Sequence, residues 1–222
     1  MELKLIARIR TDFPEKFGIP RQSGLVEGLT GRIVFEPEFR TPDALRGIRD
    51  YDRIWLIWGF DRAVKKNWSA TVRPPRLGGN QRMGVFATRS PFRPNAIGLS
   101  CVKLTGVEET AEGTVLLVSG VDMMDGTPIY DIKPYLPFAD AFPDARAGFS
   151  DAVRDYSLRV EAPEELLAPV PQDKRQALIE LLQNDPRPSY QTDPDRIYGF
   201  SFAGCEVKFR VQDGTLYVVG VE

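Results

Sequence analysis

The stretch "ATRSPFRPNAIGLS", residues 87–100, holds two cationic side chains that could bind an anionic ligand. Arg89 and Arg93 lie on either side of Pro91, and an apolar, strand-like run begins at Ile97. Because prolines stiffen the loop, each guanidinium group is expected to hold a fixed position, where it can bind a carboxylate or a phosphate. Surface ion pairs with acidic residues are the ordinary alternative, but exposed pairs contribute little stability and require no prolines. We therefore favour an anion-binding loop.

A second loop, "GVDMMDGTPIYDIKPYLPF", gathers three carboxylates within ten residues. Asp122, Asp125 and Asp131 suit a divalent cation by type, although hard cations prefer more oxygen ligands at closer spacing. Asp125 precedes Gly126, which is typical of a turn whose side chain bonds to neighbouring backbone amides. We prefer a carboxylate that bonds ribose hydroxyls or faces a cationic ligand, and we expect that no metal is required.

The sequence contains no histidine, which excludes several classes of catalytic site. Ser/His and Cys/His nucleophile pairs, histidine general bases and His-liganded zinc sites are all ruled out. The glycine fingerprints of the common dinucleotide and nucleotide loops are also absent. Cys101 and Cys205 lie far apart and give no metal-binding spacing. Any chemistry must therefore use carboxylates, Tyr, Lys, Arg or the backbone.

The net charge of −2 conceals a strong asymmetry along the chain. Residues 62–107 contain no acid but nine of the 29 cations, so the remaining residues carry 20 basic against 31 acidic side chains, or −11. The cations alternate with rigid residues, as in "VRPPRLGGNQRMG", whereas a merely solvated basic face is usually rich in Lys. The pattern favours a partner that carries phosphate groups.

The elements that must position these loops are mostly strands. Apolar and alternating runs predict strands at 3–9, 32–35, 53–60, 83–87, 97–104, 115–118 and 129–132. Gly- and Pro-rich loops join them, and before Pro143 only residues 42–48 resemble a short helix. Because long helices do not alternate with strands, we expect a mainly β protein with an antiparallel β-barrel of about seven or eight strands.

The character of the sequence changes after Pro143. Residues 144–171 are acidic and contain Ala and Pro, and "DKRQALIELLQND" has the spacing of an amphipathic helix. "EVKFRVQ" alternates, and Asp213-Gly214 predicts a hairpin turn before "TLYVVGVE". We therefore predict a β-barrel domain over 1–142 and a small α+β lobe over 143–222.

Nothing in the sequence predicts insertion into a membrane. No apolar run approaches the ~20 residues that a spanning helix needs. The opening "MELKLIARIR" lacks the long apolar stretch and cleavage site of a signal peptide. A cytoplasmic protein is the expectation.

Four motifs, in this order, resemble the YaeB/TrmO-like family of tRNA methyltransferases. They are "KFGIPRQ", "TVRPPRLGGNQRMGVFATRSPFRPNAIGLS", "DMMDGTPIYDIKPYLPF" and "DPRPSY". The likeness covers most of residues 5–142 and residues 185–190. It implies a small, homodimeric β-barrel enzyme that uses S-adenosylmethionine and differs in fold from the Rossmann-type methyltransferases. The chain is similar to proteins that methylate N6 of threonylcarbamoyladenosine beside the anticodon of certain tRNAs.

The resemblance implies that the cofactor is held by motifs in the first domain. The residues implied for S-adenosylmethionine are Pro20, Arg21, Gln22, Phe60, Asp61, Arg89, Leu99, Ser119, Gly120, Val121 and Asp122. This cofactor presents an adenine, two ribose hydroxyls, an amino-acid end and a sulfonium, so backbone donors, a carboxylate and an Arg are suitable partners. For the tRNA we expect the cations Arg73, Arg76, Arg82, Arg93, Lys133 and Arg187.

The motif "DPRPSY", residues 185–190, also has a chemical interpretation. The lone pair of an exocyclic adenine amine is delocalised into the ring, so methyl transfer needs a hydrogen-bond acceptor and a flat surface that aligns the base. Asp185 can be the acceptor and Tyr190 can stack on the base. A helix stop after "QALIELLQ" also explains this stretch, and the two roles are compatible. We name Asp185 and Tyr190 as catalytic candidates.

The chain departs from the family pattern at two places. It has Thr11-Asp12-Phe13-Pro14 where relatives often have Ser-Pro-Phe, and it has Asp61 where many have His. A contact between the cofactor and the backbone of residue 61 does not depend on that difference. A role of the side chain does depend on it.

Two other functions stay open as alternatives. The basic stretch alone suits a non-catalytic RNA-binding module. Asp122, Asp125 and Asp131 suit a metal-dependent phosphoryl enzyme. Binding of S-adenosylmethionine without metal would favour the methyltransferase over both.

Overall fold

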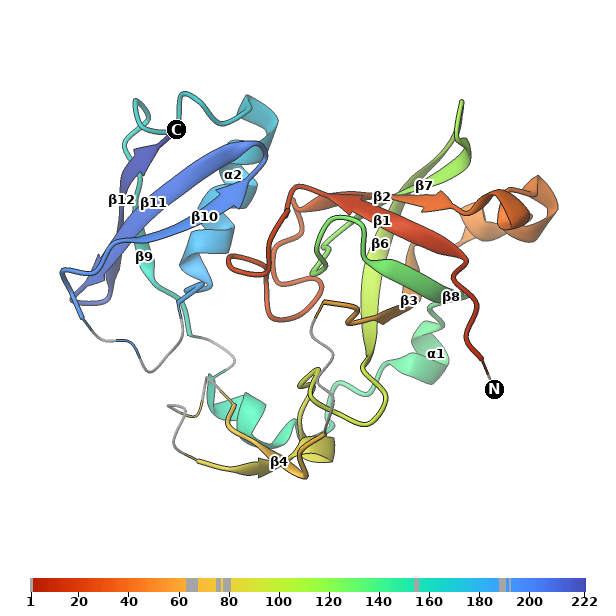
Figure 1. Ribbon diagram of the computed structural model, residues 1–222, viewed down its shortest axis with the longest axis horizontal. Coiled ribbons are helices and arrows are strands. Elements are labelled where there is room, and N and C mark those ends of the chain that lie inside the picture. Colours follow the sequence, from red (N-terminus) through yellow and green to blue (C-terminus); the bar gives the residue numbers. More distant parts are fainter. Residues whose placement is uncertain are drawn as a thin grey trace.

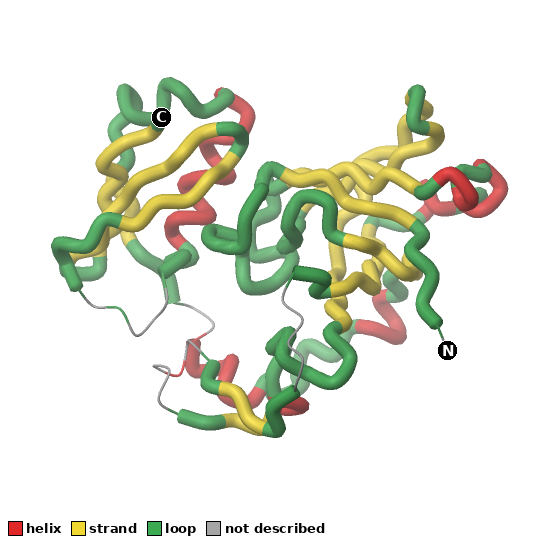
Figure 2. Tube along the Cα trace, viewed as in Figure 1, coloured by secondary structure: helices red, strands yellow, loops and turns green. Residues whose placement is uncertain are grey.

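The computed structural model describes residues 2–62, 68–74, 77, 81–153, 156–187, 191 and 193–222. Its strands form three sheets, which Figures 1 and 2 show as separate groups. One sheet closes on itself, one has four strands and the smallest has two. The mainly β class predicted from the sequence is confirmed.

The closed sheet uses six strands, and parts of the first three motifs lie in it or in the loops beside it. Its members are β1 (Ala7–Thr11), β2 (Thr30–Phe35), β3 (Arg53–Gly59), β6 (Ile97–Thr110), β7 (Gly113–Ser119) and β8 (Pro128–Pro134). They pair in the order β1-β2-β7-β6-β3-β8 and back to β1, and every pair is antiparallel. Each strand therefore has two partners, and no edge of this sheet is left unpaired.

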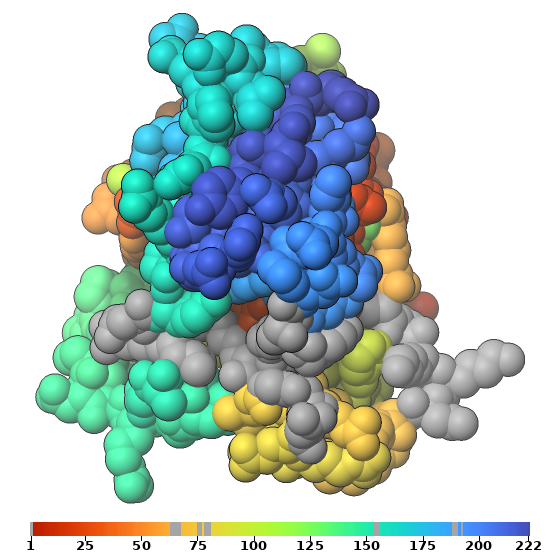
Figure 3. Space-filling view, turned by 90° about the vertical axis from the view of Figure 1, so that its left-hand side faces the viewer, coloured from red at the N-terminus to blue at the C-terminus, as the bar shows by residue number. Residues whose placement is uncertain are grey.

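The strand predicted over 83–87 does not belong to this sheet. Met83–Gly84 forms β5, which pairs only with β4 (Thr71–Val72), and a 3-10 turn, η5, follows at Val85–Ala87. Figure 3 shows this two-stranded arm, in yellow, beneath the blue C-terminal lobe. Gly and Pro residues flank these runs and limit each strand to two residues. The apolar pattern over 83–87 did not reveal this limit.

The predicted helix over 42–48 is replaced by short 3-10 turns. These are η1 (Pro37–Phe39), η2 (Pro42–Leu45) and η3 (Ile48–Asp50). Proline occupies the first position of η1 and η2, where it favours the start of a helical turn. Each turn has only three or four residues, which is too short for a stable α-helix. A four-residue α-helix, α1 (Pro137–Asp140), and a 3-10 turn, η6 (Gly148–Val153), follow the closed sheet. No helix in the described part of the chain is long and apolar enough to cross a membrane.

The C-terminal lobe packs a helix against a four-stranded sheet. Its strands are β9 (Arg159–Glu161), β10 (Tyr198–Phe202), β11 (Cys205–Gln212) and β12 (Thr215–Val221), in the order β10-β11-β12-β9. The helix, α2 (Gln172–Gln183), confirms the predicted amphipathic segment, and it buries Ala177, Leu178, Leu181 and Leu182. The predicted turn also forms, because Asp213 and Gly214 both have positive φ.

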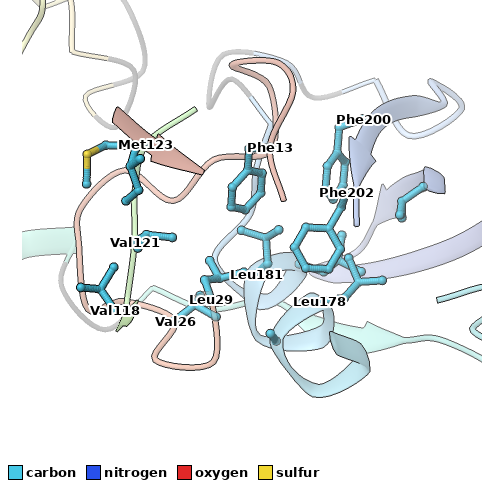
Figure 4. Close-up of a cluster of buried hydrophobic side chains, with 14 of the residues drawn as sticks. Phe13, Val26, Leu29, Val118, Val121, Met123, Leu178, Leu181, Phe200 and Phe202 are labelled. Atoms are coloured by element: carbon cyan, nitrogen blue, oxygen red, sulfur yellow. The ribbon is translucent and has the colours of Figure 1, made fainter. Parts of the chain in front are cut away.

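One hydrophobic core runs from the closed sheet into the C-terminal lobe. Phe13, just after β1, packs with its ring centroid 5.5 Å from that of Phe202, and Leu178 and Leu181 of α2 line the same space (Figure 4). Gly18 has φ 95°, and a side chain there would overlap the ring of Phe200. The loop that leads to the "PRQ" motif is therefore fixed by the C-terminal lobe.

Candidate active site

A buried relay of hydrogen bonds ends at Asp122. The indole Nε1 of Trp58, on β3, donates to the hydroxyl of Ser100, on β6, at 2.9 Å. That hydroxyl donates to the Asp122 carboxylate at 2.7 Å. The Trp58 ring lies over Gly98, where any side chain would overlap it. The two strands thus fix both groups that orient the carboxylate.

Burial raises the pKa of the Asp122 carboxyl to about 6. The hydrogen bond from Ser100 opposes this shift most strongly, followed by backbone N–H groups of Asp122 and Ser23 and by the positive charge of Arg89. A carboxylate in such a position is ionised at neutral pH but poorly hydrated. It is therefore suited to bind a cation or hydroxyl donors of a ligand.

The "PRQ" loop lies beside this carboxylate. The hydroxyl of Ser23 accepts a hydrogen bond from the Cys101 N–H at 3.1 Å, and the Gly24 N–H donates to the Gly120 carbonyl at 2.9 Å. Arg89 donates from its guanidinium group to the side-chain oxygen of Gln22. Three motifs that are distant in sequence therefore meet along β6.

The predicted segment 119–122 enters the core from the end of β7. Ser119 and Val121 are buried, and Gly120 has φ 76°, a conformation that favours glycine. The Gly120 N–H donates to the carbonyl of Leu29 at 2.8 Å. This turn delivers Asp122 to the relay.

The other predicted cofactor residues lie on either side of this centre. Pro20 is buried, whereas Leu99 is 53% exposed on the outer face of β6. The Phe60 N–H donates to the Ala96 carbonyl at 2.9 Å, and its ring lies 4.2 Å from that of Trp58. Asp61 follows on the surface. Leu99 pairs with Ile57 of β3, close to the strand end that carries Phe60 and Asp61.

A cavity of about 320 Å3 opens where β3 ends. Its lining includes Phe60, Asp61, Trp68, Phe92, Arg93 and Tyr130. Neither Asp122 nor Arg89 lines it. The predicted cofactor residues therefore form two neighbouring groups, one around Asp122 and one at this cavity.

Asp185 accepts four hydrogen bonds at the end of α2. Arg187 supplies three of them, from its backbone N–H at 3.3 Å and from its guanidinium group at 2.8 and 3.0 Å. The Tyr156 hydroxyl supplies the fourth at 2.9 Å. A carboxylate has about four acceptor sites, so those of Asp185 are filled. Asp185 has φ 49° and its N–H donates to the Leu182 carbonyl, as expected for a helix stop.

Ionisation of this cluster is set by the same contacts. Burial and the hydrogen bond to Asp185 raise the pKa of the Tyr156 hydroxyl. The hydrogen bond to Asp185 raises the pKa of Arg187. Tyr156 therefore keeps its proton and Arg187 its charge at neutral pH. Tyr190, the second catalytic candidate, lies outside the described residues.

Arg21 connects the "PRQ" and "DPRPSY" motifs. Its guanidinium group donates to the backbone carbonyl of Arg187 at 2.9 Å. Only 12% of the Arg187 side chain is exposed, which argues against its predicted contact with a tRNA phosphate. Its charge is used within the protein, on Asp185.

The remaining predicted tRNA contacts differ in their surroundings. Arg73 and Arg82 are exposed, and Arg82 donates to the Thr71 hydroxyl at 3.2 Å. Arg93 donates to the Thr88 carbonyl at 3.1 Å, and Lys133 pairs with Asp131 at 2.9 Å. Arg76 lies outside the described residues. Within the described chain neither Arg89 nor Arg93 pairs with a carboxylate, so the ion-pair alternative for that loop finds no support.

The three aspartates considered for a metal have separate partners. Asp122 bonds Ser100, and Asp131 pairs with Lys133. Asp125 accepts from the Thr11 N–H at 3.1 Å and lies 3.6 Å from a guanidinium nitrogen of Arg10. Among the described residues, no three His, Cys, Asp or Glu side chains form a group that could hold a metal ion. The metal-dependent phosphoryl enzyme finds no support here.

The sequence interpretation missed Ser100 and Tyr156. Ser100 had a usable signal, because it is a polar residue at an inward position of the alternating strand "IGLSCVKL". Tyr156 had none, since its contact with Asp185 depends on how residues 156–158 run beside the end of α2. Only the fold brings these two segments together.

The chain matches two family models. One describes the tRNA-methyltransferase O N-terminal domain and matches residues 8–141, and the other describes the TrmO C-terminal domain and matches residues 155–222. A curated relative in Escherichia coli K12, named tRNA (adenine(37)-N6)-methyltransferase, is 38% identical over 100% of this chain and 97% of its own length.

A second relative and a solved structure agree with these matches. A protein of Pyrococcus abyssi, named "Probable S-adenosyl-L-methionine-binding protein", is 38% identical over 65% of this chain and 73% of its own length. A crystal structure of TrmO from Pseudomonas aeruginosa superposes with a TM-score of 0.79 and 33% identity, and the match covers 100% of this chain and 98% of that one.

Proposed function

Because this chain belongs to the tRNA-methyltransferase O family, we propose that it transfers a methyl group from S-adenosylmethionine to N6 of an adenine in tRNA. We propose further that the adenine is threonylcarbamoyladenosine beside the anticodon, as the motif resemblance implies. The observation that carries the proposal is the meeting of Gln22, Arg89 and Asp122, which come from three separate family motifs.

The residues around Asp122 fit the chemistry of the cofactor. Its buried carboxylate suits hydroxyl donors or a positive sulfonium, and the Arg89 guanidinium suits the carboxylate end of an amino acid. Gln22 holds Arg89, and Ser23 donates to Asp122. We propose that these residues hold S-adenosylmethionine, which supplies the methyl group when bound. The proposed cofactor site is completed by Pro20, Phe60, Asp61, Leu99 and residues 119–121.

The second part of the proposal concerns the target base. Asp185 is the acceptor for the adenine amine, and Tyr190 carries the base by stacking. Because the acceptor sites of Asp185 are filled, the amine must replace one existing donor. Tyr156 is the exchangeable one, since half of its surface is exposed, whereas Arg187 is buried against Asp185. Arg187 then keeps the carboxylate in place during the exchange.

We also propose the division of the chain into domains 1–142 and 143–222, homodimer formation and a cytoplasmic location. The closed sheet ends at β8 and the second sheet begins at β9, which supports the boundary. Arg73, Arg82, Arg93 and Lys133 are the described cations that we assign to tRNA phosphates.

The proposal is tested by methyl transfer to tRNA that does or does not carry the threonylcarbamoyl group. The purified chain and isotopically labelled S-adenosylmethionine should yield labelled N6-methyl-threonylcarbamoyladenosine after nucleoside digestion and mass spectrometry. A chelator should not lower the yield. The label on a ring nitrogen or a ribose, or cofactor binding without any transfer, would contradict the proposal.

A further inference from the structure

Two aromatic rings stand out of the surface at the two-stranded arm. Trp68 precedes β4, and Phe86 lies in η5 after β5. The pairing of Thr71 with Gly84 and the hydrogen bond from the Val85 N–H to the Ala70 carbonyl bring the two ends together. Their ring centroids are 6.3 Å apart with planes inclined by 24°. We call Trp68 and Phe86 the aromatic platform.

The aromatic platform is open to solvent. Trp68 is 53% exposed and Phe86 is 72% exposed, and neither belongs to the hydrophobic core. The two stacked rings cover the faces that they turn toward each other, so their exposed area lies on the outer faces and edges. Such exposed apolar groups commonly mark interaction sites.

Fixed positive charge adjoins the aromatic platform. The Arg93 guanidinium lies over the Phe86 ring, 5.9 Å from its centroid, and donates to the carbonyls of Thr88 and Ser90 at 3.1 and 3.5 Å. Arg82, beside β5, is exposed and bonds Thr71. The whole stretch 62–107 lacks acidic residues. A negatively charged partner therefore finds no opposing carboxylate from this stretch.

The platform also borders the cavity at the end of β3. Trp68 and Arg93 both line this space of about 320 Å3, together with the rings of Phe92 and Tyr130. Asp61 is the carboxylate among its lining residues, and Asn95 adds an amide. Because Phe60 and Asp61 of this cavity are assigned above to S-adenosylmethionine, the platform lies at the edge of the proposed cofactor site, and a base that stacks there would adjoin the cofactor.

We propose that Trp68, Phe86 and Arg93 bind an unpaired nucleotide of the tRNA anticodon loop. A base stacks on the exposed ring face, and the adjacent guanidinium group binds the phosphate. A base must leave the helical stack to use such a surface, so a loop nucleotide fits and a duplex does not. This inference rests on the proposed function, because it assigns part of the tRNA to a surface outside the Asp122 and Asp185 groups.

The binding test compares RNA affinity in variants of the full chain at fixed ionic strength. The probes are an anticodon stem-loop RNA and a duplex RNA without a loop. Trp68→Ala and Phe86→Ala should each weaken stem-loop binding about 5- to 150-fold, the range for one stacking contact, and should hardly change duplex binding. Trp68→Phe keeps a ring and should bind within a few-fold of wild type.

Two controls separate stacking from folding and surface effects. Phe138→Ala removes an 87% exposed ring on α1, outside the basic stretch, and should leave RNA affinity unchanged. Phe86→Leu keeps apolar volume but loses the ring, so it should weaken binding like Phe86→Ala. Melting temperatures near wild type would show that each variant is folded. A Phe86→Leu variant that binds the stem-loop as wild type does would overturn the proposal.

A second copy of this chain is the competing occupant of the aromatic platform. In that case Trp68→Ala and Phe86→Ala would shift the RNA-free protein to a smaller assembly in analytical ultracentrifugation, and any loss of RNA affinity would follow that shift. This result would overturn the proposal. If wild type methylates tRNA but the platform variants bind as wild type does, only this inference fails. If platform variants lose stem-loop binding while wild type transfers no methyl group, only the proposed function fails.

Discussion

Arg21 bonds the backbone carbonyl of Arg187 at 2.9 Å, although 166 positions separate them in the sequence. The bond joins the loop proposed to hold the cofactor to the segment proposed to hold the target base. Transfer of a methyl group requires these two ligands to be aligned to within a fraction of an ångström. Arg21 is thus expected to affect alignment as well as binding.

Arg21→Ala should lower the single-turnover rate of methylation about 10- to 100-fold, since a hydrogen bond from a charged group contributes about 1.5–3 kcal/mol. Affinity for S-adenosylmethionine should fall by less than the rate. Arg32→Ala, at an exposed position on β2, is the matched control and should change neither quantity. A rate that falls only in proportion to cofactor affinity would show that Arg21 merely binds the cofactor.

Tyr156→Phe separates the two roles of Asp185. If the adenine amine replaces the Tyr156 hydroxyl, loss of that hydroxyl should leave the turnover number within about threefold of wild type. Asp185→Asn removes the charged acceptor and should lower it about 100-fold or more. Cofactor affinity should stay near wild type in both variants.

Melting temperatures complete that comparison. Asp185→Asn also breaks the ion pair with Arg187, so some loss of stability is expected. Were Asp185 only a helix stop, its Asn variant would melt earlier but methylate at the normal rate per folded molecule. Tyr190→Phe should cost far less activity than Tyr190→Ala, which removes about 1–3 kcal/mol of stacking.

Arg89→Ala should weaken S-adenosylmethionine binding by about 1.5–3 kcal/mol, because a guanidinium that bonds a carboxylate is lost. Isothermal calorimetry measures this directly. Arg89→Lys keeps the charge but not the planar guanidinium group. Its affinity for S-adenosylmethionine should therefore lie between those of wild type and Arg89→Ala. If cofactor affinity is unchanged and tRNA binding is weaker, Arg89 binds a tRNA phosphate and not the cofactor.

Asp122 predicts a pH dependence with a definite sign. Its pKa of about 6 lies above the ordinary value of 3.8, so the native protein binds the proton more tightly than the unfolded chain. The stabilisation by this group is complete below about pH 3.8 and is lost as the pH rises through 6. Cofactor affinity should change in the opposite sense, falling as the pH drops from 7 to 5. In Asp122→Asn both dependences near pH 6 should flatten, as measured by calorimetry and denaturant titration.

Phe13→Ala should lower the free energy of unfolding by about 3–5 kcal/mol, the usual cost of removing a buried ring. Denaturant titration measures the loss, and Phe138→Ala on the surface is the control with a near-zero effect. Because Phe13 leads into the loop of Arg21 and Gln22, cofactor affinity should fall as well. Stability loss with unchanged affinity would mean that the loop is held by its other contacts.

The helix α2 and the β11–β12 hairpin could be predicted because local patterns determine them. Leu178 and Leu181 repeat with the helical period, and Asp213-Gly214 supplies the positive φ angles of a tight turn. The three-residue strand β9 could not be predicted, since its pairing with β12 is parallel and comes from distant sequence.

The candidate site could also be predicted only in part. Arg89 and Asp122 could be singled out from their residue types and loops, whereas Gln22 follows from the family resemblance. The contacts that give them a chemical environment could not be predicted, because Ser100 lies on β6 and comes near Asp122 only through the pairing of β6 with β7. The burial of Arg187 likewise depends on tertiary packing that its motif does not reveal.

The insertion of Phe13 beside Phe202 has a consequence for how the protein denatures. Lys174 of α2 also pairs with Asp12 at 2.7 Å, and the Ala203 N–H donates to the Asp12 carbonyl, so a single short loop ties both halves. The halves should melt in one cooperative transition, with equal calorimetric and van't Hoff enthalpies. A fragment that stops at residue 142 would expose Phe13 to water and should aggregate when produced alone.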